Sequence, residues 1–333
     1  MEVFFYNTPA HYYSKVFSYF SEHSTPQSSP WIMKTFLFIL SFHFFSVSLF
    51  SQYLWDGGIK LGGSNYLGDI GGGAGTRRDF VPDMKMQETK MSAGAFARYK
   101  CYPTISVLLS YNYGRIAGDD KLSSNPGRHY RNLSFRNDIH ELALEGQWYF
   151  YTVDDLGHSY TYRTAFRAYF GLGVAGFYHN PLAYYQGQWY ALRPLRTEGE
   201  SKPYATYCVA IPVSMGFYFT FKRSWRLGWD IDCRTTFTDY LDDVSGRYAS
   251  PSQLSSPLAI ALANRTGELH PSTAMAANYT PGNKRGDPAH NDSYIFTTIN
   301  ASYVFRGRWY RRGYNGSHGR VNRHRRKHVR MRF

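Results

Sequence analysis

Three aspartates lie close together in the last third of the chain. Asp239, Asp242 and Asp243 fall within the segment 236–248. Clustered carboxylates suit Ca²⁺, so this segment is a candidate cation site. The alternative is structural: the aspartates form a turn that pairs with Arg247 and caps the mouth of a barrel. We favour the turn and expect no metal site.

Two further groupings have the residue types of enzyme sites. Ser134, Asp138 and His140 carry the hydroxyl, carboxylate and imidazole found in lipid hydrolases and acyltransferases that act at a barrel rim. These residue types are common on any strand, so their closeness in sequence is weak evidence for catalysis. The glycine-rich run 71–75 is followed by neither Lys-Ser/Thr nor a helical pattern, which argues against a phosphate-binding loop. We therefore predict a non-enzymatic protein without catalytic residues or cofactors.

The elements around these residues are long alternating strands. From Val209 to Phe221 every second residue is large and apolar, and the residues between them are small or polar. Strict alternation of this kind predicts a strand with one apolar face. The pattern recurs about eight times, while no apolar run reaches the roughly 18–20 residues of a membrane-spanning helix. The predicted strands are 54–63, 92–100, 104–115, 139–151, 166–178, 207–221, 225–240 and 293–305.

These strands predict an all-β fold, an eight-stranded antiparallel transmembrane barrel with its apolar faces toward lipid. Aromatic residues make up 18% of the chain, as the apolar band and aromatic girdles of such barrels require. Short and long connections alternate along the chain. Since barrels of this class keep short turns on the periplasmic side, we expect both termini in the periplasm and the long loops outside.

Ten charged residues fall on the inward faces of these strands. An eight-stranded barrel has an interior just wide enough for side chains, so five acids and five bases predict a charge network that closes the lumen. A selective pore or a catalytic carboxylate pair is the rival interpretation. The ten residues are Asp56, Lys60, Arg98, Glu141, Glu145, Arg167, Arg226, Asp230, Asp232 and Arg234.

The N-terminal region carries an export signal. The longest apolar run, 36–50, follows a lysine and ends in small and polar residues, which is typical of a secretory signal peptide. We expect residues 33–51 to be this signal and the mature protein to begin at Gln52. Residues 1–32 are interpreted as an over-extended start.

The C-terminal region differs from the barrel in composition. After the barrel, assigned to residues 52–306, the tail 307–333 is rich in arginine and glycine. The stretch 306–333 has eleven Arg or Lys residues and no Asp or Glu, within a chain of formal net charge +14. This composition predicts a disordered basic tail. Behind a signal peptide, nucleic acid is not an available partner.

Four segments of the barrel resemble a known family. The runs 62–69 and 236–248, supported by 135–141 and 192–199, resemble the PorG-type outer-membrane barrel of the Bacteroidota type IX secretion and gliding machinery. The run Asp-Tyr-Leu-Asp-Asp-Val-Ser is the most specific part. The matching residues are Ser64, Asn65, Tyr66, Gly68, Asp69, Asp239, Tyr240, Leu241, Asp242, Asp243, Val244 and Ser245.

The resemblance implies a structural role in the outer membrane. Such barrels are linked to a periplasmic ring, formed by a lipoprotein and its partner, and hold that ring to the membrane. The expected partners are therefore these ring proteins and outer-membrane lipid. The alternatives are a small barrel that binds a ligand or forms a narrow pore and, less favoured, a rim-active lipid enzyme.

Overall fold

The computed structural model describes residues 55–71, 86–154, 164–222, 224–270 and 272–305. The predicted extension 1–32, the signal peptide 33–51 and the basic tail 307–333 lie outside these residues. Most of the glycine-rich run 71–75 does too. The fold described below is therefore that of the barrel and of its connections.

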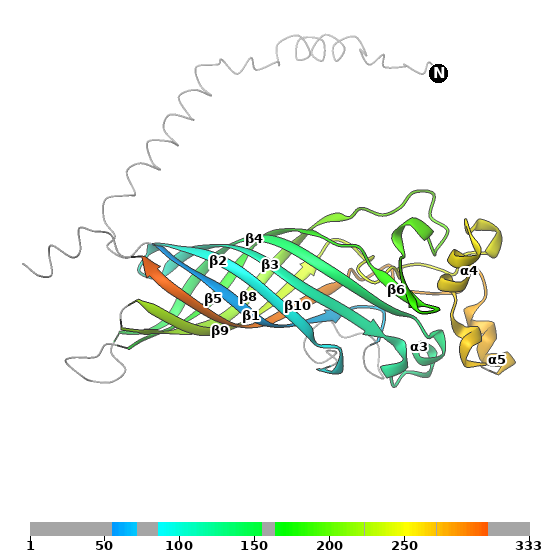
Figure 1. The fold of residues 1–333 in the computed structure, drawn as a ribbon, viewed down its shortest axis with the longest axis horizontal. Coiled ribbons are helices and arrows are strands. Elements are labelled where there is room, and N and C mark those ends of the chain that lie inside the picture. Colours follow the sequence, from blue (N-terminus) through cyan, green and yellow to red (C-terminus); the bar gives the residue numbers. More distant parts are fainter. Residues whose placement is uncertain (1–54, 72–85, 155–163, 223, 271, 306–333) are drawn as a thin grey trace, which may run out of the picture. The chain divides into compact units, whose positions relative to one another are not determined.

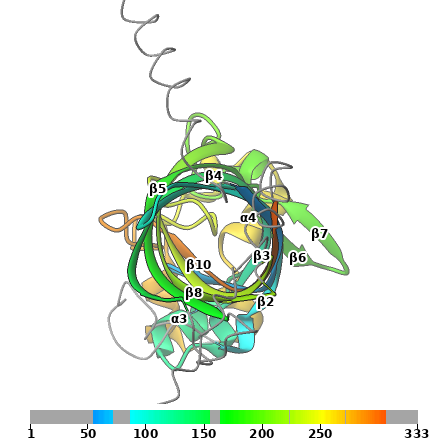
Figure 2. The ribbon, with the colours of Figure 1, turned by 90° about the vertical axis from the view of Figure 1, so that its left-hand side faces the viewer.

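Within the described residues, eight antiparallel strands close into a barrel (Figures 1 and 2). The ring closes because β1 pairs with both β2 and β10. The predicted fold class is thus confirmed. The barrel strands are β1 (Trp55–Leu67), β2 (Lys90–Tyr102), β3 (Ile105–Asp119), β4 (Ser134–Val153), β5 (Ala165–Tyr178), β8 (Tyr207–Phe221), β9 (Trp225–Thr236) and β10 (Ser293–Phe305).

Strand ends differ from the predicted ends where polar residues interrupt the alternation. β9 was predicted to run to Tyr240 but ends at Thr236, whose hydroxyl lies 3.0 Å from the carbonyl oxygen of Thr238 and 2.6 Å from that of Asp292. These contacts turn the chain out of the barrel wall. β1 and β4 are longer than predicted, because backbone pairing continues through Gly, Ser and Asn residues that show no apolar period.

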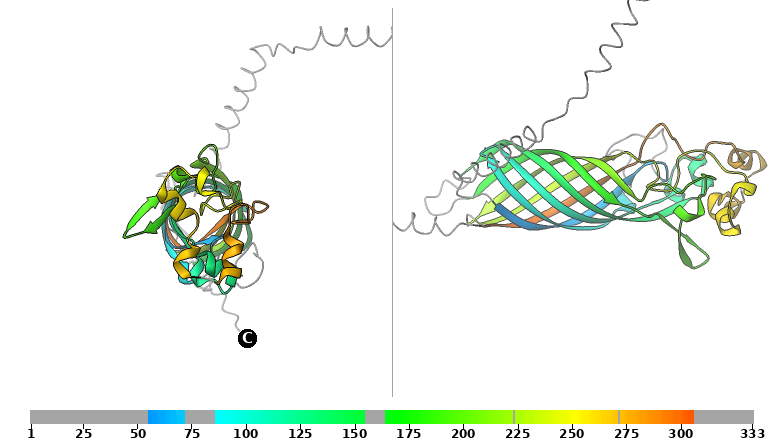
Figure 3. Two further views of the ribbon diagram at one scale, coloured as in Figure 1. Left: turned by 90° about the vertical axis from the view of Figure 1, so that its right-hand side faces the viewer. Right: turned by 90° about the horizontal axis from the view of Figure 1, so that it is seen from above.

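The polypeptide returns at one end by short turns and at the other by long loops. Trp55 pairs with Phe305, so the start of β1 and the end of β10 lie side by side at the short-turn end of the barrel. At the opposite end the long connections carry the helices of the described residues (Figures 1 and 3). The helices are α3 (Pro126–Arg131), α4 (Pro257–Ala263) and α5 (Thr273–Ala276), with 3₁₀ turns at 86–88, 120–122, 193–195, 251–253, 266–269 and 277–279. None of the described helices is long and apolar enough to cross a membrane.

A hairpin extends the sheet sideways beyond β4 at the long-loop end. It joins the barrel where Leu182 pairs with Arg136, and it projects from the wall (Figure 2). Its two turn residues, Gln186 and Gly187, both have positive φ, as tight hairpins require. The sequence predicted only a loop here, since four-residue strands are too short to show a period. The hairpin consists of β6 (Leu182–Tyr185) and β7 (Gln188–Ala191).

The outer surface of the barrel wall is an apolar band. Large aliphatic side chains on several strands are 49–62% exposed. Exposing so large an apolar surface to water is unfavourable, whereas contact with the hydrocarbon chains of lipid is not. The wall therefore has the organisation of an outer-membrane barrel. Members of the band are Ile59, Leu61, Leu142, Leu144, Leu172, Val174, Val209, Val213 and Ile299.

We predict that the seam between β1 and β10 tolerates no side chain at Gly58. A Cβ atom there would lie 2.2 Å from the carbonyl oxygen of Ala301 and 2.5 Å from the Ser302 side chain. Gly58→Ala should therefore destabilise the folded barrel by about 1–3 kcal/mol. The measurement is urea unfolding in detergent, with the folded fraction determined from the heat-modifiable gel mobility. Gly176→Ala is the matched control, because a Cβ atom at Gly176 meets nothing within 4 Å. Equal stability of the two variants would contradict the prediction.

Candidate functional site

Lys60 on β1 is the centre of one ion-pair group inside the barrel. Its ammonium nitrogen lies 3.0 Å from the carboxylate of Asp230 and 3.1 Å from that of Asp232, both on β9. The Thr298 hydroxyl donates a further hydrogen bond to Asp230. All three charged side chains are at most 3% exposed. Charges so deeply buried are stable only when partners surround them.

Arg234 links a second set of acids to the first. Its Nε lies 2.9 Å from Glu141, and its Nη2 lies 3.5 Å from Glu145 and 3.7 Å from Asp232. Neutral side chains supply further hydrogen bonds: Ser214 donates to Glu145 at 2.8 Å, and Tyr294 and Asn112 donate to Glu141 at 2.7 Å and 2.8 Å. The two groups therefore form one continuous polar network across the lumen.

Asp56 organises a third group nearer the short-turn end. It accepts from Arg98 at 3.3 Å, from Arg226, and from the Ser302 hydroxyl at 3.0 Å. The Arg98 guanidinium also lies 4.8 Å from the ring centre of Tyr218, a distance at which the π-face attracts a cation. Side chains thus occupy the interior that the ribbon in Figure 2 leaves open.

Arg167 does not join this network, which corrects the sequence prediction. Its Nη2 lies 3.2 Å from Asp154, whose side chain is 78% exposed at the short-turn end. Arg167 stands near the start of β5, so its side chain reaches the turn rather than the middle of the lumen. The nine predicted charges that do meet are five acids and four bases, and the hydroxyl donors above add hydrogen bonds to the carboxylates.

At the long-loop end, the four segments that carry the family resemblance come together as a plug in the barrel mouth. The Tyr66 hydroxyl lies 2.6 Å from Asp242 and 2.8 Å from Asp292. Asp242 also accepts from the backbone amides of Ile70 at 3.1 Å and Val244 at 2.9 Å. Asp242 therefore ties the end of β1 to the segment that leaves β9.

The surroundings of Tyr66 explain Gly68 and Asp69 in the segment 62–69. A Cβ atom at Gly68 would lie 1.8 Å from the Tyr66 hydroxyl, so only glycine fits there. The Asp69 amide donates to the same hydroxyl at 2.9 Å, and the Asp69 carboxylate accepts from the Asp287 amide at 2.6 Å. Ser64, earlier in β1, donates to the carbonyl of Arg115 at 2.6 Å.

Asp243 and Glu198 join the segment 192–199 to the segment 236–248. Asp243 has a positive φ of 68° and accepts from Thr197 at 2.5 Å and from Tyr204 at 2.8 Å. Glu198 accepts from the amide of Ser245 at 2.9 Å and pairs with Arg285 at 3.0 Å. Burial raises the pKa of the Asp243 carboxyl to about 7, against the opposing effect of Arg285.

Apolar and aromatic residues fill the spaces between these hydrogen bonds. Leu241 and Val244 are fully buried, and the side-chain amide of Asn137 donates to the Leu241 carbonyl at 2.8 Å. Phe135 packs edge-on against Tyr66, with 4.7 Å between ring centres. Segment 135–141 thus contacts both of the most specific segments of the resemblance.

Aromatic stacking and burial also fix other residues of the resembling segments. Tyr240 stacks on Tyr204, with 4.7 Å between ring centres, and Tyr204 is in turn parallel to the His179 ring at 6.1 Å. Burial lowers the pKa of His179 to about 4. Asp239 and Asn65 are also buried, at 6% and 4% exposure.

The interpretation of the aspartates as a turn needs one correction. Asp243 faces Arg285, whereas the exposed Arg247 donates to the carbonyl of Gly282. The carboxylates of Asp242 and Asp243 each accept from different N–H and O–H groups rather than converging on one point. No group of His, Cys, Asp and Glu in the described ranges is arranged to hold a metal ion.

The candidate catalytic grouping on β4 does not assemble. Asp138 pairs with Arg115 at 2.6 Å, His140 shares a hydrogen bond of 2.9 Å with Tyr111, and the Ser134 hydroxyl accepts from Arg265. The three side chains therefore have separate partners.

Sequence reasoning missed Arg285 and Asp292, which complete the plug. Both lie in the stretch 249–292, outside the segments that carry the resemblance. The only available signal was the place of Asp292, directly before β10.

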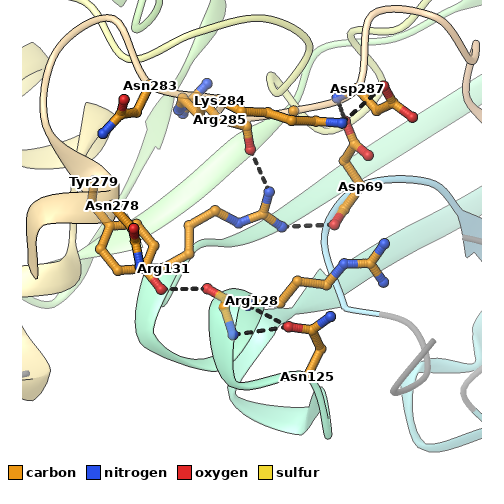
Figure 4. Close-up of a pocket in the computed structure, with 12 residues that line it drawn as sticks. Asp69, Asn125, Arg128, Arg131, Asn278, Tyr279, Asn283, Lys284, Arg285 and Asp287 are labelled. Carbon is orange, nitrogen blue, oxygen red and sulfur yellow. Dashed lines mark hydrogen bonds and ion pairs between the residues drawn. The ribbon is translucent and has the colours of Figure 1, made fainter. Parts of the chain in front are cut away.

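A polar cavity of about 560 Å³ opens beside the plug (Figure 4). Arg131 crosses its floor, donating to the carbonyls of Asp69 and Arg285 while pairing with Asp120 at 2.7 Å. Lys284 pairs with Asp287 at 3.0 Å on the rim. Such a surface can hydrogen-bond a polar ligand. The other lining residues are Asn125, Gly127, Arg128, Asn278, Tyr279, Asn283 and Gly286.

We predict that Arg234 is essential for stability of the barrel. Arg234→Met keeps much of the side-chain volume but leaves Glu141, Glu145 and Asp232 without this cation, at a cost of about 3–5 kcal/mol. Urea unfolding in detergent measures the loss. Lys202→Met, which removes a charge from an exposed loop residue, should change the stability little. Equal effects of the two substitutions would argue against an energetically important network.

We also predict a pH dependence of the plug that originates at Asp243. A carboxyl that titrates near 4 when unfolded and at about 7 when folded holds its proton only in the folded state between these values. Its contribution to stability therefore falls as the pH rises from 4 to 7 and is constant above. Hydrogen exchange of the segment 239–247, corrected for intrinsic rates, should show greater protection at pH 5 than at pH 7.5.

Asp243→Asn should reduce this difference, since the amide does not titrate. Asp154→Asn, at the exposed short-turn end, is the control and should leave it unchanged. An undiminished difference in Asp243→Asn would assign the pH dependence to another group.

Comparisons with solved structures find barrels of low sequence identity. The N-terminal barrel domain of OprF from Pseudomonas aeruginosa is 8% identical, covering 75% of this chain and 97% of that chain, with a TM-score of 0.32. OprG from the same organism is 12% identical, with coverages of 77% and 99% and a TM-score of 0.36. Neisserial surface protein A is 7% identical, with coverages of 77% and 98% and a TM-score of 0.34. No curated protein matches the chain.

One domain family matches the sequence directly. Domain of unknown function (DUF6089) matches residues 34–256, more than half of the chain. The match spans β1 to β9 and all four segments that build the plug. The chain therefore belongs to the DUF6089 family.

Proposed function

We propose that this protein is a structural outer-membrane barrel of the type IX secretion apparatus, which anchors the periplasmic lipoprotein ring to the membrane. The observation that carries the proposal is the convergence of four separate segments in one plug. The resemblance to the PorG-type barrel rests on these segments. The segments contact one another through Tyr66, Asp242 and Glu198. The resemblance therefore concerns one three-dimensional feature and not scattered matches.

The filled lumen favours an anchor over a conduit. Arg98, Glu141, Glu145 and Arg234 are at most 1% exposed. The mouth is further occupied by the plug, whose Leu241 is fully buried. A barrel with such an interior offers exported proteins no path, so its contribution to secretion would be attachment. The outer surface supplies the membrane anchor through its apolar band.

The basic C-terminal stretch is the proposed contact with the ring. The last barrel strand ends at Phe305 at the short-turn end, which we assign to the periplasm. Eleven positive charges without an acid in 306–333 form a strong electrostatic footprint for an acidic protein surface. The short connections at the same end would contact the partner beside it.

We predict that truncation after Arg308 leaves the barrel folded but reduces recovery of ring proteins. Affinity purification from outer membranes of native cells, at low and high salt, measures this recovery. Full-length protein should lose ring proteins as salt rises, because salt screens exposed charges within about 8–10 Å. The truncated protein should recover less at low salt and respond weakly to salt.

Lys202→Gln combined with Arg247→Gln, which removes charges at the opposite end of the barrel, should recover ring proteins normally. Heat-modifiable mobility verifies that each variant is folded. Absence of ring proteins from the full-length sample would contradict the proposed function. Unchanged recovery after truncation would instead move the contact to the short turns.

One observation favours a second candidate, a ligand-binding barrel. The polar cavity beside the plug is large enough, at about 560 Å³, for a small hydrophilic molecule. Arg128 donates to the carbonyl of Gly71 there, and no acid in the described residues lies within ion-pair distance of it. The affinity purification separates the two functions, because a ligand-binding barrel would recover no ring proteins.

A further inference from the structure

A second cleft, of about 570 Å³, lies on the side of the barrel at the long-loop end. Its walls are the long-loop ends of β3 and β4 and the β6–β7 hairpin. Its acidic lining residues are Glu88 and Asp119. The basic residues that line it are Lys90, Arg115, Lys121, Arg136 and Arg265.

Three of these five cations have acidic partners. Lys90 lies 3.2 Å from Glu88, and Arg265 lies 2.9 Å from Glu268. Arg115 binds Asp138, as described above. Within the described part of the chain, no acid lies within 4 Å of the side-chain nitrogens of Lys121 or Arg136. The cleft therefore presents two cations, Lys121 and Arg136, that form no ion pair within the described residues.

Arg136 is held in place without a hydrogen bond. Its guanidinium carbon lies 4.0 Å from the ring centre of Trp189 on the hairpin, as in a cation–π contact. Its Nε is buried and has no hydrogen-bond partner among the described residues. A buried donor without a partner is costly. A guanidinium fixed in this way is suited to a phosphate oxygen.

The cleft begins where the apolar wall ends. On the lipid-facing side, Tyr111 on β3 lies level with Leu142 on β4, and Tyr113 and His140 come next toward the long loops. The His140 ring lies 6.4 Å from that of Tyr111 and 5.2 Å from that of Tyr113. Aromatic residues of this kind mark the membrane–water interface of outer-membrane barrels. The Arg115–Asp138 pair follows immediately, so the cleft lies at the depth of lipid headgroups.

We propose that this cleft binds the phosphate of a phosphorylated glycolipid in the outer leaflet, the headgroup of lipopolysaccharide. Arg136 and Lys121 would contact the phosphate, and Trp189 would keep the guanidinium oriented. This inference rests on the proposed outer-membrane location with the long loops outside. Since it concerns the lipid-facing wall, it is independent of the contact with the ring.

The test uses full-length protein in nanodiscs that contain diphosphoryl lipid A or, in a separate arm, phosphatidylglycerol. Native mass spectrometry counts the lipids that remain bound. Arg136→Gln combined with Lys121→Gln should reduce retained lipid A at least fivefold. Lys202→Gln combined with Arg247→Gln is the matched control, because it removes two exposed charges outside the cleft and should change retention little.

Three outcomes would overturn the proposal: equal loss in both double variants, equal retention of phosphatidylglycerol and lipid A, and displacement of lipid A by millimolar inorganic phosphate. The last result would assign the cleft to free phosphate. Heat-modifiable mobility confirms that the variants are folded. Recovery of ring proteins is scored separately, so failure of the lipid test leaves the proposed function standing.

Discussion

Pairing of buried charges inside a narrow barrel is the constraint on which this structure depends. An eight-stranded barrel has room for side chains and little else, so a charge that points inward loses its water. Lys60, Arg98 and Arg234 each recover that loss through carboxylates on other strands. The pairs of Lys60 and Arg234 also join strands that are not neighbours in the sheet, β1 with β9 and β4 with β9.

The plug applies the same rule at the mouth of the barrel. Asp242 and Asp243 are buried where the long loops enter, and each accepts hydrogen bonds from two or more segments. The loops are consequently fixed to the barrel end by polar contacts, with Leu241 and Val244 packed between them. This arrangement explains why the most specific run of the sequence is rich in aspartate.

The exterior follows the opposite rule, with apolar residues in the middle and polar residues at the rim. Between the two lies an aromatic row around His140. Beyond it lies the cleft that Lys121 and Arg136 line. A single strand such as β4 thus contributes lipid-facing leucines, interfacial rings and headgroup-level charge in sequence. The wall is therefore a graded surface that matches the layers of a membrane leaflet.

The sequence by itself determined the strands, their two faces and hence the barrel, because a period of two is a local property of the chain. Nine of the ten inward charges that it named meet in the three groups of the lumen. Tertiary structure alone decided which charges meet. Lys60 pairs across the sheet with Asn300, and Asn300 with Gly228, yet the curvature of the closed barrel brings Lys60 to Asp230 and Asp232. For the same reason Asp243 meets Arg285 rather than its neighbour Arg247: partners in a plug depend on how loops fold over one another, which no local period records.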